Sequence, residues 1–351
     1  IISNNTAFAG GGIAYHSIDN TELNPKIENC LIQNNFASEG GGIFCANISP
    51  VIENSQIIYN GMDENGSGGG LNAILAYPIL QNVNISGNES KWVGGIYCTS
   101  GGINLENVII SNNISIVHGA GAWFGQNNYI IAEKVLLINN HAQSFGGGLW
   151  MMENNNVELI NMTISGNNSA DGGGIYINNS ELIILNSIIW DNYPQQALLD
   201  LDLGILNIAF SNIEGGENGI QINSGTLNWL NGNIFSNPQF NDVFELTNNS
   251  PCIDAGTAYF ILEGEVILNL SETEFWGNAP DLGALEQNTS IYGGDVNNDG
   301  DINILDVVLI INSILTGEIL DQNEFNSADL NQDGQLDVID IIILISLILD
   351  N

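Results

Sequence analysis

A repeat of 25 to 28 residues runs through the first two thirds of the chain, and it constrains the fold more than any other feature. Each copy contains a short aliphatic segment with one polar anchor residue, which is followed six residues later by an Asn. Successive anchors are separated by 25, 28, 25, 27, 27, 25 and 26 residues. The anchors are Asn29, Asn54, Asn82, Asn107, Lys134, Asn161, Asn186 and Asn212.

A glycine-rich marker such as GGGIF, GGGLW or GGGIY follows most of the closing asparagines. The period is too short for paired-helix repeats, and it holds too much Gly, Asn and β-branched residue for helix. It fits one turn of a parallel β-solenoid, in which successive coils stack ~4.8 Å apart. We therefore expect about nine coils with an aliphatic interior. We also expect asparagine side chains that hydrogen-bond to each other along the stack and glycines that permit positive φ at the corners.

These markers resemble the repeats of right-handed parallel β-helix proteins, including the polymorphic outer-membrane protein type, over residues 1–232. The resemblance implies an all-β right-handed parallel β-helix and no particular chemistry. Residues 233–288, with NPQFND, SPCIDAGT and APDLGALEQ, resemble the segment that closes such helices in many secreted bacterial proteins. That resemblance implies a C-terminal cap, which a solenoid needs because its last coil otherwise presents an open strand edge.

Residues 289–351 contain two acidic dodecamers, DVNNDGDINILD (295–306) and DLNQDGQLDVID (329–340). A calcium loop of the EF-hand type places oxygen ligands at positions 1, 3, 5, 7, 9 and 12, with Gly at position 6. The pattern predicts two Ca²⁺ ions, with Asp301 and Gln335 contributing backbone carbonyls. The predicted ligands are Asp295, Asn297, Asp299, Asp301, Asn303 and Asp306, then Asp329, Asn331, Asp333, Gln335, Asp337 and Asp340.

Each dodecamer precedes an apolar helical segment, and position 12 is Asp where an ordinary EF-hand has Glu. This duplicated loop–helix unit resembles a dockerin type I module, which implies a cohesin-like protein partner that binds the calcium-stabilised helices. The hydroxylated pair that many cellulosomal dockerins present at positions 10 and 11 is replaced by Ile304–Leu305 and Val338–Ile339, so a cellulosome-type partner is not implied. We expect the apolar helix pair to be covered by its own β-helix or by another protein; the alternative is a compact pair with an apolar surface.

The charge balance excludes several partners. Lys and Arg total 3 against 40 Asp and Glu, which gives a net charge of −37. Nucleic acids and anionic membrane surfaces require basic side chains, so neither is an expected partner. The sequence contains no run of the ~20 apolar residues that a membrane span needs. Calcium loops with few charges suit millimolar extracellular metal, and we expect a secreted, cell-surface-associated prokaryotic protein.

Strand alternation places one residue of each glycine-rich marker on the outer surface. The resulting file is aromatic at most positions, with Ala14 and Asn72 interrupting it. We predict either a stacking platform for sugar rings or a protein, or an aromatic stack covered by a loop or by the C-terminal module. The residues are Phe44, Tyr97, Trp123, Trp150 and Tyr176.

Evidence for catalysis is slight. Lyases of this architecture generally use a Lys or Arg base, but the chain lacks Arg and its three lysines occupy unrelated positions. Glycoside hydrolases need carboxylates that converge on one site. The best candidates are Asp200 and Asp202, which lie two residues apart and so on one face of a strand, with Asp171 as a possible third carboxylate. The sequence does not decide whether this pair is catalytic.

We therefore favour a non-catalytic, extracellular structural or adhesive rod that docks to a cohesin-like partner or to another copy through the calcium module. The alternative is a secreted polysaccharide-binding or polysaccharide-degrading β-helix, a lyase or hydrolase, tethered by the same module. An enzyme would require a groove with clustered carboxylates or a lysine.

Overall fold

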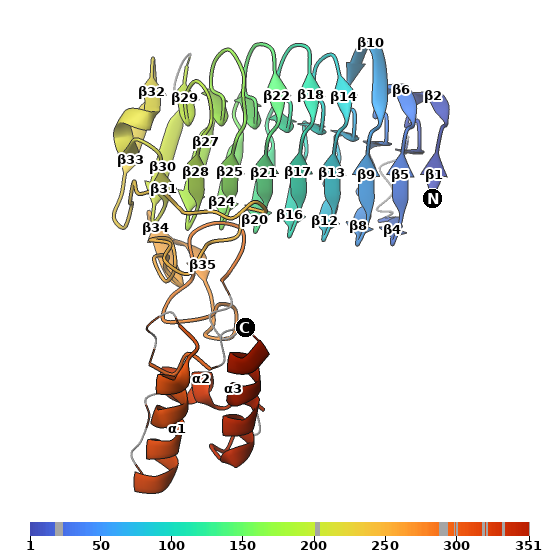
Figure 1. Cartoon of the computed structure of the whole chain (residues 1–351). Coiled ribbons are helices and arrows are strands. Elements are labelled where there is room, and N and C mark those ends of the chain that lie inside the picture. The colour runs from blue at the N-terminus through green and yellow to red at the C-terminus, as the bar shows by residue number, and fades with distance from the viewer. Residues whose placement is uncertain are drawn as a thin grey trace.

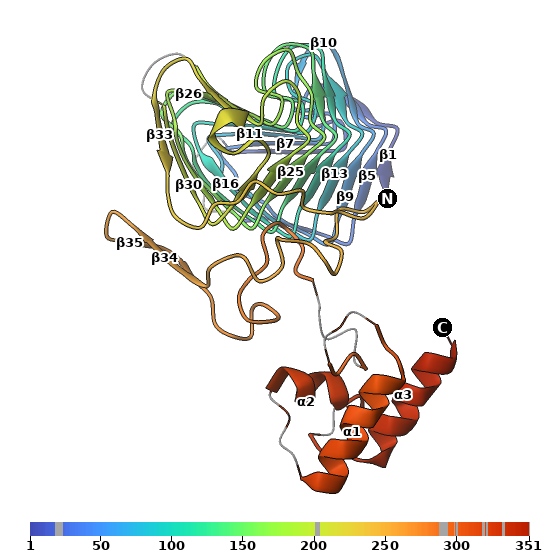
Figure 2. The same ribbon diagram turned by 60° about the vertical axis from the view of Figure 1, so that its left-hand side comes forward.

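The computed structural model describes residues 1–17, 24–200, 204–287, 294–297, 299, 301–317, 320, 322–331 and 334–350. A row of stacked β-coils comes first, and an irregular segment follows along the side of the coils (Figure 1). A separate helical region completes the chain (Figure 2). The predicted fold class, a parallel β-solenoid followed by a small helical region, is confirmed.

In the described residues, three parallel sheets of nine strands each form the walls of the solenoid. The first sheet contains β1 (Ile2–Ser3), β5 (Leu31–Gln33), β9 (Gln56–Ile58), β13 (Asn84–Ser86), β17 (Ile109–Ser111), β21 (Leu136–Ile138), β25 (Thr163–Ser165), β28 (Ile188–Trp190) and β31 (Asn212–Ile213). The second contains β3 (Ile13–His16), β7 (Ile43–Ala46), β11 (Leu71–Ile74), β15 (Ile96–Thr99), β19 (Ala122–Phe124), β23 (Leu149–Met152), β26 (Ile175–Asn178), β29 (Ala197–Leu199) and β32 (Ile220–Ile222). The third contains β4 (Lys26–Glu28), β8 (Val51–Glu53), β12 (Ile79–Gln81), β16 (Gly102–Glu106), β20 (Tyr129–Glu133), β24 (Asn156–Ile160), β27 (Glu181–Leu185), β30 (Ile205–Ala209) and β33 (Thr226–Trp229).

Shorter elements fill the corners. Between the first and second sheets lie β2 (Thr6–Ala9), β6 (Phe36–Glu39) and β10 (Gly61–Ser67), then β14 (Glu89–Ser90), β18 (Ile114–Ser115) and β22 (His141–Ala142). A 3₁₀ turn, η1 (Gly216–Gly219), precedes β32, and the hairpin of β34 (Tyr259–Leu262) and β35 (Glu265–Asn269) follows the solenoid.

The predicted asparagine ladder runs through the buried corner after the first sheet. The side-chain Nδ2 of each member donates to Oδ1 of the next, at 2.9 to 3.1 Å. Most members also donate from Nδ2 to a strand carbonyl one coil earlier, so the buried amides satisfy their hydrogen-bonding capacity. The ladder consists of Asn5, Asn35, Asn60, Asn88, Asn113, Asn140, Asn167 and Asn192.

The repeat anchors form a second file, at the corner between the third and first sheets. They take left-handed φ values of 47° to 55°, a conformation that Asn tolerates better than most residues. The eighth anchor differs from the prediction, because Phe210 takes this place with φ 44°. Asn212 pairs with Ile188 two residues further along, and its side chain exchanges hydrogen bonds with Ser236.

The C-terminal segment (235–287) packs on the side wall of the last coils. Ala284 N donates to Thr163 Oγ1 at 3.0 Å, and the Asn186 side chain binds both the N–H and the carbonyl of Thr257 at 2.9 and 2.8 Å. Leu268 of the hairpin packs against aliphatic residues at the corner of the third and first sheets. The predicted domain boundaries at 232 and 288 stay predictions, and the second falls on residues outside the described part.

The helical region contains α1 (Ile304–Thr316), α2 (Gln322–Ala328) and α3 (Val338–Asp350). Its core contains Val307 and Ile310 of α1, Ala328 of α2 and Leu344 of α3. The short α2 was not expected from the sequence. Within the described residues, no helix is long and apolar enough to cross a membrane.

Candidate metal and docking site

The first dodecamer loop is organised by one buried carboxylate. Asp306 is fully buried, and its Oδ1 accepts from the N–H groups of Val296 and Asn297 at 2.9 and 3.2 Å. Its Oδ2 accepts from Asn303 N at 2.9 Å, while the Asn303 side chain accepts from Leu305 N. This capping box joins the loop to the first turn of α1.

The second loop repeats this arrangement 34 residues later. Asp340 is also fully buried, and its Oδ1 accepts from Leu330 and Asn331 at 3.0 and 3.3 Å. Its Oδ2 accepts from Asp337 N at 2.8 Å, and Asp337 Oδ1 accepts from Ile339 N at 2.7 Å. The two loops are therefore the same local structure built twice, each at the start of a helix.

The remaining candidate ligands of the first loop face one another across the turn. Asp299 N donates to Asp295 Oδ1 at 3.1 Å and to Asn297 Oδ1 at 2.9 Å. Asp301 N donates to Asp299 Oδ1 at 3.0 Å. In the second loop, Asp329 Oδ2 accepts from Gly334 N at 2.9 Å, and the predicted ligand Asp333 lies outside the described residues.

The donor set of these loops fits calcium, because it consists of carboxylate, amide and carbonyl oxygens, which are the ligands that hard cations prefer. Among the described residues, however, no three acidic, His or Cys side chains converge closely enough to hold a metal by themselves. Each predicted site takes part of its ligand set from neutral groups, and uncompensated carboxylates repel one another. The ligand assignments stay predictions.

The helices that follow the loops present a duplicated apolar face, which we call the docking face. Four pairs of residues related by 34 positions lie on it, and every member is between 46% and 78% exposed. The solenoid does not cover these side chains, contrary to one of the two expected modes of coverage. The pairs are Ile304 and Val338, Leu305 and Ile339, Val308 and Ile342, and Leu315 and Leu349.

Two protein-family models match the chain. The model of the dockerin type I domain matches residues 293–349, and that of the right-handed beta helix region matches residues 94–258. The chain carries a dockerin type I domain behind a right-handed β-helix region. Searches of curated proteins and of solved structures gave no match.

Dockerin type I domains bind calcium, which supports the predicted metal in general terms. A dockerin domain also implies docking to a cohesin partner, and such domains occur in secreted and cell-surface proteins. The matched range contains both dodecamers and the docking face. The loops and the apolar face described above therefore belong to the dockerin domain.

The predicted aromatic file is in register on the outside of the second sheet. Tyr97 pairs with Trp123, Trp123 with Trp150, and Trp150 with Tyr176. Phe44 also faces outward, one step beyond Asn72, but Phe44 and Tyr176 are only 9% and 3% exposed.

The rings of this file pack on one another and on a neighbouring loop file. The ring centroids of Tyr97 and Trp123 are 4.4 Å apart, and those of Trp150 and His118 are 4.3 Å apart. Phe145 stacks on His118 and lies 4.9 Å from Tyr176. Because the ring faces are occupied in this way, the geometry favours the loop-covered stack over a sugar platform at these residues.

The candidate catalytic carboxylates are only partly described. Asp200 accepts from the Tyr176 hydroxyl at 2.6 Å and from Asn223 Nδ2 at 3.0 Å. Burial and the bond to Asp200 raise the pKa of Tyr176. Asp202 lies outside the described residues and Asp171 is exposed, so a catalytic role for this pair stays an untested prediction.

Two carboxyl groups that no sequence pattern marked, those of Asp281 and Glu286, have strongly raised pKa values. Burial raises the pKa of Asp281 to about 6 and that of Glu286 to about 7. Such shifts often mark active sites, but here backbone N–H groups occupy the oxygens. Asp281 accepts from Asp254 N and Gln287 N at 2.8 and 2.7 Å, and Glu286 accepts from Asp281 N at 2.9 Å. These carboxyls therefore hold the fold of the C-terminal segment.

Proposed function

We propose that this protein is an extracellular, non-catalytic rod that is held to a cohesin-class protein through the docking face of its dockerin domain. The observation that carries the proposal is the duplicated, exposed apolar face directly after two oxygen-rich loops. Large exposed apolar patches on soluble proteins commonly mark protein–protein interaction sites. The β-helix serves as the rigid part, and its stacked amides supply that rigidity.

The loops would act by fixing the helices. Two Ca²⁺ ions, one in each dodecamer, would neutralise the carboxylates that otherwise repel within each loop. On the protein side, Asp306 holds the backbone N–H groups of Asn297 and Asn303, while the residues next to Asn303 are Ile304 and Leu305 of the docking face. Order in the loop thus sets the position of the exposed pair.

The chemistry of the face restricts the partner. Among its eight residues there is no charge and no hydroxyl, so its contribution to affinity comes mainly from burial of apolar surface, ~25 cal/mol per Å² removed from water. The partner surface should therefore be apolar at its centre. Binding to such a surface should depend weakly on monovalent salt, because the docking face carries no charges to be screened.

The direct experiment is isothermal titration of the full chain with a panel of cohesin modules, in calcium and after EDTA. We expect at least one cohesin to bind in calcium and to lose binding after EDTA. The double variant Leu305→Ser/Ile339→Ser should weaken binding by at least about ten-fold, because it places hydroxyls where apolar contact is needed.

The control variant is Val266→Ser, which changes an equally exposed apolar residue, 55% exposed, on hairpin strand β35. It should bind as the unchanged chain does. The proposal fails if no cohesin binds in calcium, or if the chain instead self-associates through the docking face in sedimentation experiments. A polysaccharide-degrading enzyme would need converging carboxylates in a groove. In the part of the chain that the structure describes, the two hollows reported contain one carboxylate between them.

A further inference from the structure

A second exposed surface lies on the solenoid, where each strand of the third sheet begins. One outward residue per coil forms a file there, with Gly102, Tyr129 and Asn156 in register on β16, β20 and β24. Glu181 and Ile205 continue the file on β27 and β30. Ile79 of β12 pairs with Asn104. Tyr77 lies two residues before Ile79, as Gly102 lies two residues before Asn104, so Tyr77 extends the file by one coil.

Two tyrosines of this file present open aromatic surface. Tyr77 is 60% exposed and Tyr129 is 50% exposed. Gly102 lies between them in the register. A Cβ atom there would clash with the carbonyl oxygen of Tyr129 and stand 3.0 Å from Cδ1 of Tyr77, so the glycine permits the close approach of both tyrosines. Within the described part of the chain, neither ring contacts another aromatic ring, in contrast to Trp123 and Trp150 on the neighbouring wall.

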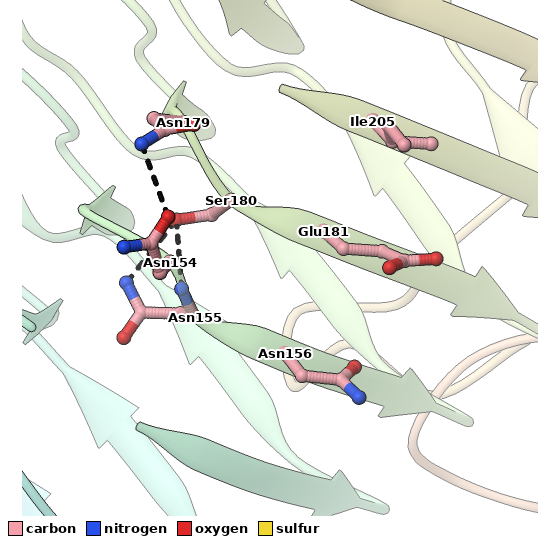
Figure 3. Close-up of a pocket in the computed structure, with 7 residues that line it drawn as sticks. All are labelled: Asn154, Asn155, Asn156, Asn179, Ser180, Glu181 and Ile205. Atoms are coloured by element: carbon pink, nitrogen blue, oxygen red, sulfur yellow. Dashed lines mark hydrogen bonds between the residues drawn. The ribbon is translucent and has the colours of Figure 1, made fainter. Parts of the chain in front are cut away.

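A shallow hollow of about 300 Å³ continues the file beyond Tyr129, because Asn156, the register partner of Tyr129, is one of its lining residues. Asn156, Glu181 and Ile205 project side by side from successive strands on its floor (Figure 3). Its lining contains four side-chain amides and one carboxylate. The lining residues are Asn154, Asn155, Asn156, Asn179, Ser180, Glu181 and Ile205.

We propose that this tyrosine strip, formed by Tyr77, Tyr129 and the hollow, binds an extended, uncharged polysaccharide along the rod axis. Exposed aromatic rings provide stacking faces for the C–H surface of sugars. Asparagine amides donate and accept hydrogen bonds, and the Glu181 carboxylate accepts them, so both can pair with sugar hydroxyls. Successive coils are ~4.8 Å apart, close to the advance of one sugar unit in an extended chain.

The charge of the strip selects among glycans. Glu181 lies in the file, and Glu158 accepts a hydrogen bond from the Tyr129 hydroxyl at 3.2 Å. The file and hollow contain no lysine, and the whole chain carries −37. Uronate polymers would be repelled by this field, whereas uncharged glycans are not. The strip is independent of the docking face, so it adds a second attachment point to the rod.

The test is affinity electrophoresis of the full chain in gels that contain neutral polysaccharides of the β-glucan, xylan and galactomannan types, with polygalacturonate as the anionic comparison. We expect retardation by at least one neutral glycan and none by polygalacturonate. The double variant Tyr77→Ala/Tyr129→Ala should weaken retardation by at least about ten-fold.

The matched control is Tyr59→Ala/Tyr259→Ala, which removes two tyrosines of similar exposure, 63% and 53%, elsewhere on the surface. It should be retarded like the unchanged chain. Three results would overturn the proposal: no neutral glycan retards the chain, only polygalacturonate does, or the Tyr77→Ala/Tyr129→Ala variant binds as well as the control. None of these results bears on cohesin binding, which is measured separately with the docking-face variant.

Discussion

At the level of single residues, asparagine has two structural roles in this solenoid. The buried ladder asparagines link neighbouring coils, while the anchor asparagines supply left-handed corners. Both could be predicted because they recur at a fixed period. The eighth anchor could not, because Asn212 continues the sequence pattern but bonds to Ser236 in the C-terminal segment, and Phe210 takes the corner.

Replacing one ladder residue should destabilise the rod. Asn113 accepts from Asn88 and donates to Asn140 and to the carbonyl of Ile85, each at 3.0 Å. Asn113→Ala removes these buried bonds and the one from Asn88 N to the Asn113 side-chain oxygen, and we expect it to lower the free energy of unfolding by about 3 kcal/mol in urea titrations. The control Asn104→Ala removes an exposed asparagine and should change it little; equal effects of the two variants would contradict this role.

The buried carboxyls of the C-terminal segment predict a pH dependence. The pKa values of Asp281 and Glu286, about 6 and about 7, lie above the unfolded values of ~3.9 and ~4.3. The native state therefore retains protons that the unfolded chain releases, and the stability contributed by these groups is lost as the pH rises from about 4 to about 7.

The segment that carries these groups packs on the solenoid, so we expect the melting temperature of the solenoid transition to be higher at pH 5 than at pH 7.5, measured without added divalent ions. Glu286→Gln should flatten this dependence, because the amide cannot ionise. The exposed control Glu89→Gln should leave it unchanged. A melting temperature that rises over this interval in the unchanged chain would show that the assignment is wrong.

At the scale of elements, the helices after the two loops followed from the sequence because each loop fixes the start of its helix by a capping box or its equivalent. Helix α2 was missed, since it has only seven residues and its stability depends on tertiary contacts such as that of the buried Ala328. The tyrosine strip was also missed, because the residues at its positions change from aromatic to amide to carboxylate in successive coils. No repeated residue type marks that file.

The paired loops predict the number of metal ions bound. Equilibrium dialysis in monovalent salt, which screens the general acidic surface, should give two Ca²⁺ ions per chain. Asp295→Ala or Asp329→Ala should each leave one ion, and the double variant none, because position 1 supplies a ligand in both loops. Asp242→Ala removes an exposed acid outside the loops and should leave two ions bound. Two ions retained in the double variant would contradict the ligand assignment.

At the scale of the whole molecule, the chain combines the solenoid rod, the C-terminal segment (235–287) and the dockerin domain. The rod was predictable because every coil repeats the same contacts. The placement of the C-terminal segment could not be predicted, because contacts such as that of Ala284 with Thr163 join residues 121 positions apart and leave no local sequence pattern. The docking face was predicted either to be covered or to remain as an exposed apolar surface of a compact helix pair. Its residues are exposed in the structure, and under the proposed function a partner covers them.

Scanning calorimetry of the full chain in calcium and in EDTA shows whether a metal-independent rod carries a calcium-dependent docking domain. Calcium that binds only the folded loops must stabilise them by mass action. We expect two transitions, of which EDTA lowers only that of the dockerin domain, with recovery when excess calcium is added. If the dockerin transition does not move in EDTA, the domain does not depend on calcium. If the rod melts earlier in EDTA, the rod is not independent of metal.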